Sequence, residues 1–188
     1  MKSLHKDSCV AIVGCGGLGS NCANNLVRAG FLNLVLIDFD VVCQANLNRQ
    51  FFFCDQIGFP KVDALADNLF RVNPNINIRI VGEAITKENI DSYLHNCDAI
   101  CECVDIPNTK RLIVEYALCH SKIVIAASGI CGYTSDAKVT TRKVSETCFV
   151  VGDFMTDTRK GDSPVAPKVS IVSALQAEIL IKNSSDNL

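Results

Sequence analysis

An apolar run that ends in a glycine cluster constrains the fold of this chain more than any other feature. The run Val10–Val13 leads directly into Gly14, Gly16 and Gly19, which have the spacing G-x-G-x-x-G. About twenty residues later, a second apolar run ends in Asp38. A strand, a glycine turn, a helix and a second strand in this order are typical of a unit that holds a nucleotide.

Strand-like and helix-like segments alternate over the first 127 residues. The expected strands are Cys9–Val13, Leu34–Asp38, Ile76–Val81, Ala99–Val104 and Lys122–Ala127. The expected helices are Gly17–Ala29, Pro60–Val72, Thr86–His95 and Pro107–Cys119. This alternation predicts an α/β fold of the Rossmann-like kind, with a mostly parallel sheet and helices on both faces.

The last third of the chain no longer shows this regular alternation of strand-like and helix-like segments. Residues 129–152 mix short β-like runs with glycine turns, which predicts a few antiparallel strands. Residues 153–168 are polar and hold two prolines, and we expect a mobile loop there. Val169–Lys182 has the pattern of an amphipathic helix, and 183–188 is expected to be a frayed tail. We therefore expect residues 1–188 to form a single domain.

Composition excludes several classes of protein. The chain has 188 residues, of which 48% are hydrophobic and 20% charged, with a formal net charge of −2. This balance fits a globular protein and gives no indication of a nucleic-acid or membrane partner. No apolar run reaches the roughly 20 residues of a membrane span, and the amino terminus lacks a secretory pattern. Eleven cysteines without any C-x-x-C pair predict a cytoplasmic protein with reduced thiols and no zinc site.

Each glycine of the cluster has a distinct expected role. Gly14 permits a tight turn, and Gly19 lets the following helix pack closely on the strand. Gly16 and Gly17 leave room for backbone N–H groups to approach a phosphate. The alternative is a glycine-rich turn that holds no ligand.

Charged residues downstream of the cluster have the chemistry of a phosphate site. Asp38 can accept hydrogen bonds from ribose hydroxyls, or else serve as a helix cap or loop acid. Asp40 either supports that site or is solvated. Arg49 and Lys61 suit phosphate oxygens, although such cations elsewhere are ordinary surface residues. Asp105 follows the fourth strand, where a carboxylate can hold Mg²⁺ on phosphates or cap the next helix.

Several short motifs together resemble a known family. The strings G-C-G-G-L-G-S, D-F-D-V-V, N-L-N-R-Q, G-F-P-K-V and C-V-D are similar to the ATP-binding domain of ubiquitin-activating-type adenylyltransferases, the ThiF/MoeB-like superfamily. The likeness runs from about Cys9 to Lys182. It is greatest to the short ThiF-type sulfur carrier protein (ThiS) adenylyltransferases of thiamine biosynthesis, and next to the molybdopterin-synthase adenylyltransferases.

The resemblance implies ATP-dependent adenylation of the C-terminal glycine of a small ubiquitin-like sulfur carrier, by a homodimer that uses Mg²⁺ and no zinc. Arg49, Lys61 and Asp105 would be catalytic, with Asp105 serving Mg²⁺. The implied ATP-binding residues are Gly14, Gly16, Gly17, Gly19, Asp38, Asp40, Asn46, Arg49 and Lys61. The carrier supplies its own carboxylate nucleophile, so positioning and charge neutralisation carry the catalysis.

The chain also departs from the family pattern, which leaves other functions open. No arginine precedes Arg28, Ile106 replaces an asparagine, and the zinc-binding cysteine pairs are missing. The first two departures favour a weakened relative that docks a ubiquitin-like partner without activating it. A molybdopterin-type carrier, the tRNA-modifying dehydratase branch and an NAD-dependent oxidoreductase are further alternatives. The dehydratase branch would need a basic surface, and the oxidoreductase would need a substrate domain.

Overall fold

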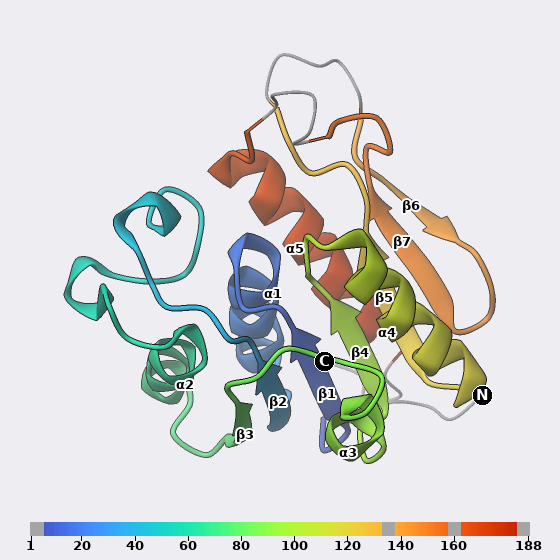
Figure 1. The fold of residues 1–188 in the computed structure, drawn as a ribbon, viewed down its shortest axis with the longest axis horizontal. Helices are drawn as coiled ribbons and strands as arrows, with labels where there is room; N and C mark the ends of the chain where they lie inside the picture. Colours follow the sequence, from blue (N-terminus) through green and yellow to red (C-terminus); the bar gives the residue numbers. More distant parts are fainter. Residues whose placement is uncertain (1–5, 133–137, 158–162, 184–188) are drawn as a thin grey trace.

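The computed structural model describes residues 6–132, 138–157 and 163–183, which form a sheet flanked by helices (Figure 1). The strands are β1 (Cys9–Val13), β2 (Asn33–Ile37), β3 (Asn77–Val81), β4 (Ala99–Glu102), β5 (Ile123–Ala127), β6 (Thr140–Lys143) and β7 (Cys148–Gly152). The helices are α1 (Gly17–Arg28), α2 (Lys61–Val72), α3 (Ile90–Leu94), α4 (Pro107–Cys119) and α5 (Ala166–Lys182). Two short 3-10 turns, η1 (Gln44–Asn46) and η2 (Cys54–Gln56), lie between β2 and α2.

The sheet has the order β3-β2-β1-β4-β5-β7-β6. β1 pairs in parallel with both β2 and β4, so the strand order reverses at β1, with β2 and β3 on one side and β4 and β5 on the other. Among the named strands of the described chain, only β6 runs antiparallel, against β7. The Rossmann-like prediction is confirmed. The reversal creates a crevice at the carboxyl ends of the strands, where such folds bind ligands.

Two apolar layers cover the two faces of the sheet. Side chains of β1 alternate between these layers: Val10 and Ile12 face α1, α2 and α5, whereas Ala11 and Val13 face α3 and α4. α1 and α5 pack closely together on the first face. The buried residues of α5 recur at helical spacing, although they include two polar residues and Ile171 on the other face is exposed; they are Val169, Val172, Ser173, Gln176, Ala177, Ile179 and Leu180.

Two predicted helices differ from the structure by more than one residue at a terminus. α3 covers only Ile90–Leu94, because the Asn89 side chain forms a turn just before it: Oδ1 accepts a hydrogen bond from the Thr86 amide (2.8 Å) and Nδ2 donates to the Ala84 carbonyl (2.9 Å). α5 begins at Ala166, three residues before the predicted start, with a proline in its first turn. Part of the predicted loop, residues 158–162, lies outside the described residues, as do residues 184–188 of the predicted tail.

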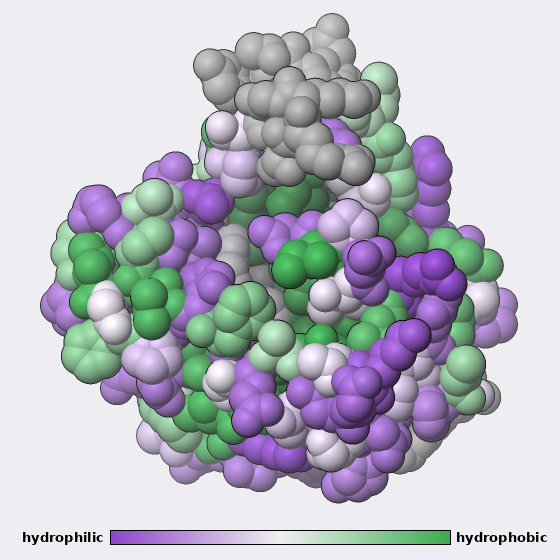
Figure 2. Space-filling model, viewed as in Figure 1, coloured by the Kyte–Doolittle hydropathy of each residue, from purple (hydrophilic) through white to green (hydrophobic). Residues whose placement is uncertain are grey.

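Surface apolar side chains gather on the connection between β2 and α2. Figure 2 shows apolar surface at the left of the view, where this connection lies. Its exposed side chains, each between 41% and 60% accessible, are Phe39, Val41, Phe53, Ile57 and Phe59. No helix in the described ranges has the length and apolar content needed to cross a membrane.

Candidate functional site

The glycine turn joins β1 to α1 at the carboxyl edge of the sheet, where the strand order reverses (Figure 1). Gly14 has φ +92° and donates its amide hydrogen to the Ile37 carbonyl (2.8 Å). A Cβ at Gly14 would lie 2.7 Å from the Cys103 carbonyl oxygen, and one at Gly19 would lie 1.8 Å from the Gly14 carbonyl oxygen. Both positions therefore require glycine for packing alone.

Gly16 and Gly17 begin α1 and have a different environment. Gly16 is the N-cap, no side chain caps the helix, and its first turn holds no acidic residue. Beyond its chain neighbours, a Cβ at Gly16 would meet one group of the described residues, the Gln50 amide nitrogen at 3.7 Å, whereas one at Gly17 would lie 3.1 Å from Val169 Cγ1. The first N–H groups of a helix lack intrahelical partners and favour an anion. The space over Gly16 is thus suited to a phosphate.

The Asp38 carboxylate ties this turn to the end of β2. Its Oδ2 accepts a hydrogen bond from the Cys15 amide (2.6 Å) and its Oδ1 accepts one from the Asp40 amide (2.9 Å). Asp38 is not the N-cap of any neighbouring helix in the described residues, whose N-caps are Gly16, Cys43 and Pro60. Burial, with the Asp38 charge as a second cause, raises the pKa of the Cys15 thiol well above its usual value. The cysteine of the turn is consequently not an activated nucleophile.

Asp40 and Lys61 form an ion pair beside Asp38. Lys61, the first residue of α2, places its Nζ 2.7 Å from Asp40 Oδ2 and its backbone amide 2.9 Å from the Asp40 carbonyl. The lysine side chain is 8% exposed and the aspartate side chain 51%. The sequence left open whether Asp40 supports the site or is solvated; in the structure it pairs with the predicted phosphate-binding lysine.

Asn46 is the last residue of η1, and Arg49 lies three residues after it. Arg49 Nη1 donates to the Ala45 carbonyl (3.0 Å) and to Asn48 Oδ1 (2.7 Å), and its Cγ would be 3.6 Å from a Cβ at Gly17. Asn46 Oδ1 accepts a hydrogen bond from the Cys43 amide (3.1 Å). The structure thus brings Arg49 to the glycine turn, with its guanidinium held by neutral oxygens.

Asp105 lies in the connection between β4 and α4. The sequence predicted a strand up to Val104, but β4 ends at Glu102, because the Glu102 side chain accepts a hydrogen bond from the Val104 amide (2.9 Å). Asp105 is exposed, caps no helix and makes no hydrogen bond or ion pair within the described ranges. Residues 103 and 104 contact the Gly14 position, so this connection borders the glycine turn. Asp105 is a carboxylate available to a ligand there.

The nature of these groups indicates which ligands they suit. Backbone N–H groups, a lysine and an arginine fit phosphate oxygens. No group of three or more potential metal ligands occurs in the described parts of the chain. Mg²⁺ is commonly held by one or two carboxylates together with substrate phosphates, so the single exposed Asp105 fits a cation that arrives with a nucleotide.

Sequence reasoning assigned no role to three polar groups near this edge. Gln50 has a buried side-chain oxygen that finds no hydrogen-bond partner among the described residues. Glu102, fully buried, is paired with Lys110, and burial raises the pKa of this carboxyl against the opposing effect of the lysine. Asp153 is paired with Lys168, in the first turn of α5. Only Gln50 carried a sequence signal, its place in the N-L-N-R-Q motif.

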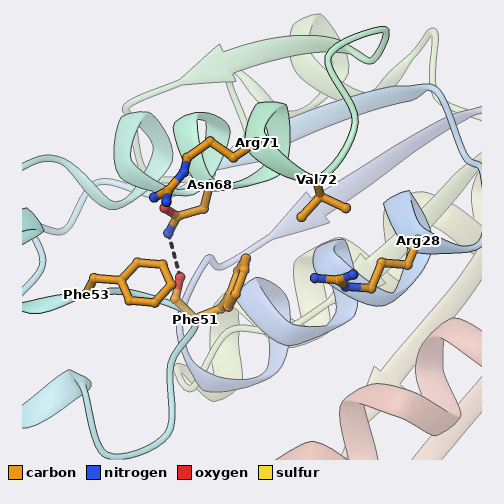
Figure 3. A pocket seen from close by; sticks show the side chains of 6 residues that line it. All are labelled: Arg28, Phe51, Phe53, Asn68, Arg71 and Val72. Carbon is orange, nitrogen blue, oxygen red and sulfur yellow. Dashed lines mark hydrogen bonds between the residues drawn. The ribbon is translucent and has the colours of Figure 1, made fainter.

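A hollow of about 250 Å³ lies beside the segment that follows Gln50 (Figure 3). It is lined by Arg28, Phe51, Phe53, Asn68, Arg71 and Val72. Asn68 Nδ2 donates to the Phe51 carbonyl (2.9 Å), the contact drawn in Figure 3, and this bond fixes the segment from the side of α2. None of the predicted site residues lines the hollow.

Comparison with solved structures shows where this fold occurs. Escherichia coli TcdA, a tRNA N6-threonylcarbamoyladenosine dehydratase solved in complex with ATP, superposes with a TM-score of 0.86 at 19% identity, covering 94% of this chain and 85% of that chain. Escherichia coli MccB with ATP superposes with a TM-score of 0.73 at 23% identity, covering 95% of this chain and 56% of that chain. These likenesses concern the fold.

Sequence comparisons identify the family. The chain is 31% identical over 184 residues to the molybdopterin-synthase adenylyltransferase of Escherichia coli (strain K12), covering 94% of this chain and 73% of that protein. It is 38% identical over 129 residues to ubiquitin-like modifier-activating enzyme 5 of Drosophila persimilis, covering 62% of this chain and 33% of that protein. It thus spans about a third of the length of such activating enzymes. Residues 2–187 match the ThiF family, and the chain belongs to that family.

Proposed function

We propose that this protein binds ATP at the glycine turn and adenylates the C-terminal glycine of a small ubiquitin-like carrier protein. The observation that carries the proposal is the placement of Arg49 and Lys61 at the edge where Asp38 anchors the turn. A relative named as an adenylyltransferase covers 94% of the chain, which supports the same activity here. A ThiS-like carrier and a homodimer are the specific forms that we propose.

The chain's own residues would act by binding and charge neutralisation. The backbone N–H groups of Gly16 and Gly17 donate hydrogen bonds to phosphate oxygens. The Asp38 carboxylate can still accept further hydrogen bonds from the ribose hydroxyls. The carrier carboxylate attacks the α-phosphorus, an acyl-phosphate bond forms, and the bond to pyrophosphate breaks. Arg49 and Lys61 stabilise the charge that develops on the phosphoryl oxygens and the leaving pyrophosphate. Asp105 would hold Mg²⁺, which screens the phosphate charge when it is bound.

A protein substrate is supported by the surface around the site. Five exposed apolar side chains, Phe39 and Phe59 among them, lie on the connection that also carries Asp40 and Arg49. Exposed apolar surface of this kind commonly marks a site of protein contact. The acceptor of the adenylyl group is therefore proposed to be a protein rather than a small molecule.

ATP–pyrophosphate exchange tests this function. The purified protein is mixed with labelled pyrophosphate, ATP, Mg²⁺ and either a ThiS-like or a molybdopterin-type carrier ending in Gly-Gly. Exchange that requires the carrier and is lost in Asp105→Ala is expected, and faster exchange with one carrier assigns the specificity. A carrier without its last glycine is the control. ATP binding without exchange on either carrier would overturn the proposal and favour a relative that docks carriers without activating them.

A further inference from the structure

The backbone of Gln50 is held against the first turns of α1. Asn21 Nδ2 donates to the carbonyl of the preceding residue, Arg49 (3.0 Å). Ser20 Oγ accepts a hydrogen bond from the amide of the following residue, Phe51 (3.0 Å). Both neighbours of Gln50 are therefore fixed to the helix that begins at the glycine turn.

The Gln50 side chain is directed toward that turn. Its amide nitrogen would lie 3.7 Å from a Cβ at Gly16, and apart from the glycine's chain neighbours no other group of the described residues would lie within 4 Å of that Cβ. The residue is 9% exposed, and its carbonyl oxygen is buried without a hydrogen-bond partner in the described chain. The amide thus reaches the space over Gly16 and leaves its own oxygen unpaired.

Gln56, six residues later, shows how a structural glutamine is satisfied in this protein. It is 8% exposed, its nitrogen donates to the Ala64 carbonyl (3.2 Å) and to Asn68 Oδ1 (2.9 Å), and its oxygen accepts from the Phe53 amide (3.1 Å). A buried polar atom without a partner destabilises the folded state, so it calls for an explanation outside folding. Hydrogen bonds within the fold therefore explain the burial of the Gln56 side chain, but they do not explain the burial of the Gln50 side chain.

We propose that Gln50 contacts the nucleotide, with its NH₂ group donating a hydrogen bond to a phosphate oxygen held over Gly16. This inference rests on the proposed function only insofar as a nucleotide binds at the glycine turn. Phosphate oxygens accept and never donate, so the NH₂ end of the amide faces them. As a neutral donor, Gln50 completes a phosphate site whose cations come from Arg49 and Lys61. The side-chain amide is already positioned for the ligand in the absence of nucleotide. Because its nitrogen faces Gly16, its oxygen is buried without a partner in the described residues.

Two leucine substitutions separate this role from a structural one. In Gln50→Leu the apo protein is expected to melt at an equal or higher temperature, because the unpaired oxygen is gone. Its affinity for ATP and AMP should fall about tenfold, equivalent to about 1.4 kcal/mol. Its affinity for adenosine should not change, since adenosine has no phosphate. In the control Gln56→Leu the melting temperature should fall, while the folded protein keeps its affinity for ATP.

Isothermal titration calorimetry with ATP, AMP and adenosine, together with thermal denaturation, provides the readouts. Gln50→Glu, which puts a negative charge at the same place, is expected to weaken ATP binding more than Gln50→Leu does. A lower apo melting temperature with unchanged ATP affinity in Gln50→Leu would show a structural role and overturn the inference, as would an equal loss of adenosine binding. Wild-type protein that binds ATP without exchange activity would remove the adenylation proposal and leave this one standing.

Discussion

The side-chain nitrogen of Lys61 lies 2.7 Å from Oδ2 of Asp40, and the backbone amide of the same lysine donates to the Asp40 carbonyl. Two bonds therefore join the first residue of α2 to the connection after β2. The ammonium is almost fully buried, whereas half of the carboxylate is exposed. A phosphate that approached Lys61 would compete with Asp40 for the same charge. The ion pair therefore has two opposing effects on an anionic ligand: it holds Lys61 at the site, and the Asp40 carboxylate repels the ligand.

Replacement of Asp40 by asparagine should separate these two effects. The free energy of unfolding is expected to fall by roughly 1–2 kcal/mol, because the buried lysine side chain loses its counter-charge. The loss stays this small because the Asp40 carboxylate is half exposed and water already weakens the ion pair. ATP affinity should increase, because a negative charge beside the phosphates has been removed. Urea denaturation and calorimetric titration measure the two quantities. Weaker ATP binding by a folded Asp40→Asn protein would show that Asp40 assists the ligand, directly or through the position of Lys61.

Alanine substitutions at two glycines of the turn should have opposite consequences. Gly16→Ala is expected to fold with little loss of stability, because beyond its chain neighbours no described atom would lie closer than 3.7 Å to the Cβ. It should nevertheless bind ATP at least tenfold more weakly, since the methyl group occupies the phosphate space. Gly19→Ala should be severely destabilised or unfolded, because its Cβ would lie 1.8 Å from the Gly14 carbonyl oxygen. Circular dichroism melting and ATP titration distinguish the two outcomes. Unchanged ATP affinity in Gly16→Ala would exclude a phosphate at that glycine.

Much of this architecture could be predicted from local patterns. The apolar run before Gly14 and the helical spacing of Pro60–Val72 predicted their elements to within a residue. Such signals are local, because the face that a helix or strand buries determines the spacing of apolar residues within that same segment. The mostly parallel sheet, though not the order of its strands, followed from the alternation of strands and helices.

Polar contacts of individual side chains were not predictable in the same way. No sequence pattern near Glu102 indicates that its side chain accepts a hydrogen bond from the Val104 amide and pairs with Lys110. The bond to the Val104 amide is why β4 ends at Glu102. The pairing of Asp153 with Lys168 joins segments fifteen residues apart, across residues that carry no regular period. Such contacts depend on where the folded backbone places the two side chains, and neither residue propensities nor the spacing of apolar residues specifies those positions.

The buried Glu102 carboxyl should give stability a characteristic dependence on pH. Burial raises the pKa of Glu102 above its usual value, with Lys110 acting in the opposite direction. A carboxyl whose pKa is raised by folding contributes most below its unfolded pKa of about 4.5, and this contribution is lost as the pH rises through the folded pKa. The stability of the wild type relative to Glu102→Gln should therefore be greatest near pH 4 and decline at higher pH. Urea denaturation of both proteins across this range is the measurement, and a difference that grows with pH would contradict it.

Asp153 should show the reverse dependence. Burial alone would raise the pKa of Asp153, but hydrogen bonds from Lys168, Thr156 and Met155 outweigh it and lower the pKa from 3.8 to about 2. This carboxylate therefore stabilises the fold above pH 4, by about 2 kcal/mol, and the contribution is lost between pH 3.8 and 2. Asp153→Asn should be less stable than the wild type by that amount at pH 7, with the difference shrinking below pH 3.8.

The surface pair of Lys143 and Glu146 offers a control for that measurement. Both side chains are more than half exposed, so Glu146→Gln should change the free energy of unfolding by less than about 0.5 kcal/mol at pH 7. Asp153, by contrast, is fully buried, its Oδ1 accepts the amides of Met155 (2.8 Å) and Thr156 (2.9 Å), and Lys168 connects it to the first turn of α5. Because α5 packs on α1 behind the glycine turn, loss of this anchor is expected to weaken ATP binding as well as stability. Equal small effects of Asp153→Asn and Glu146→Gln would show that the buried pair does not fix α5.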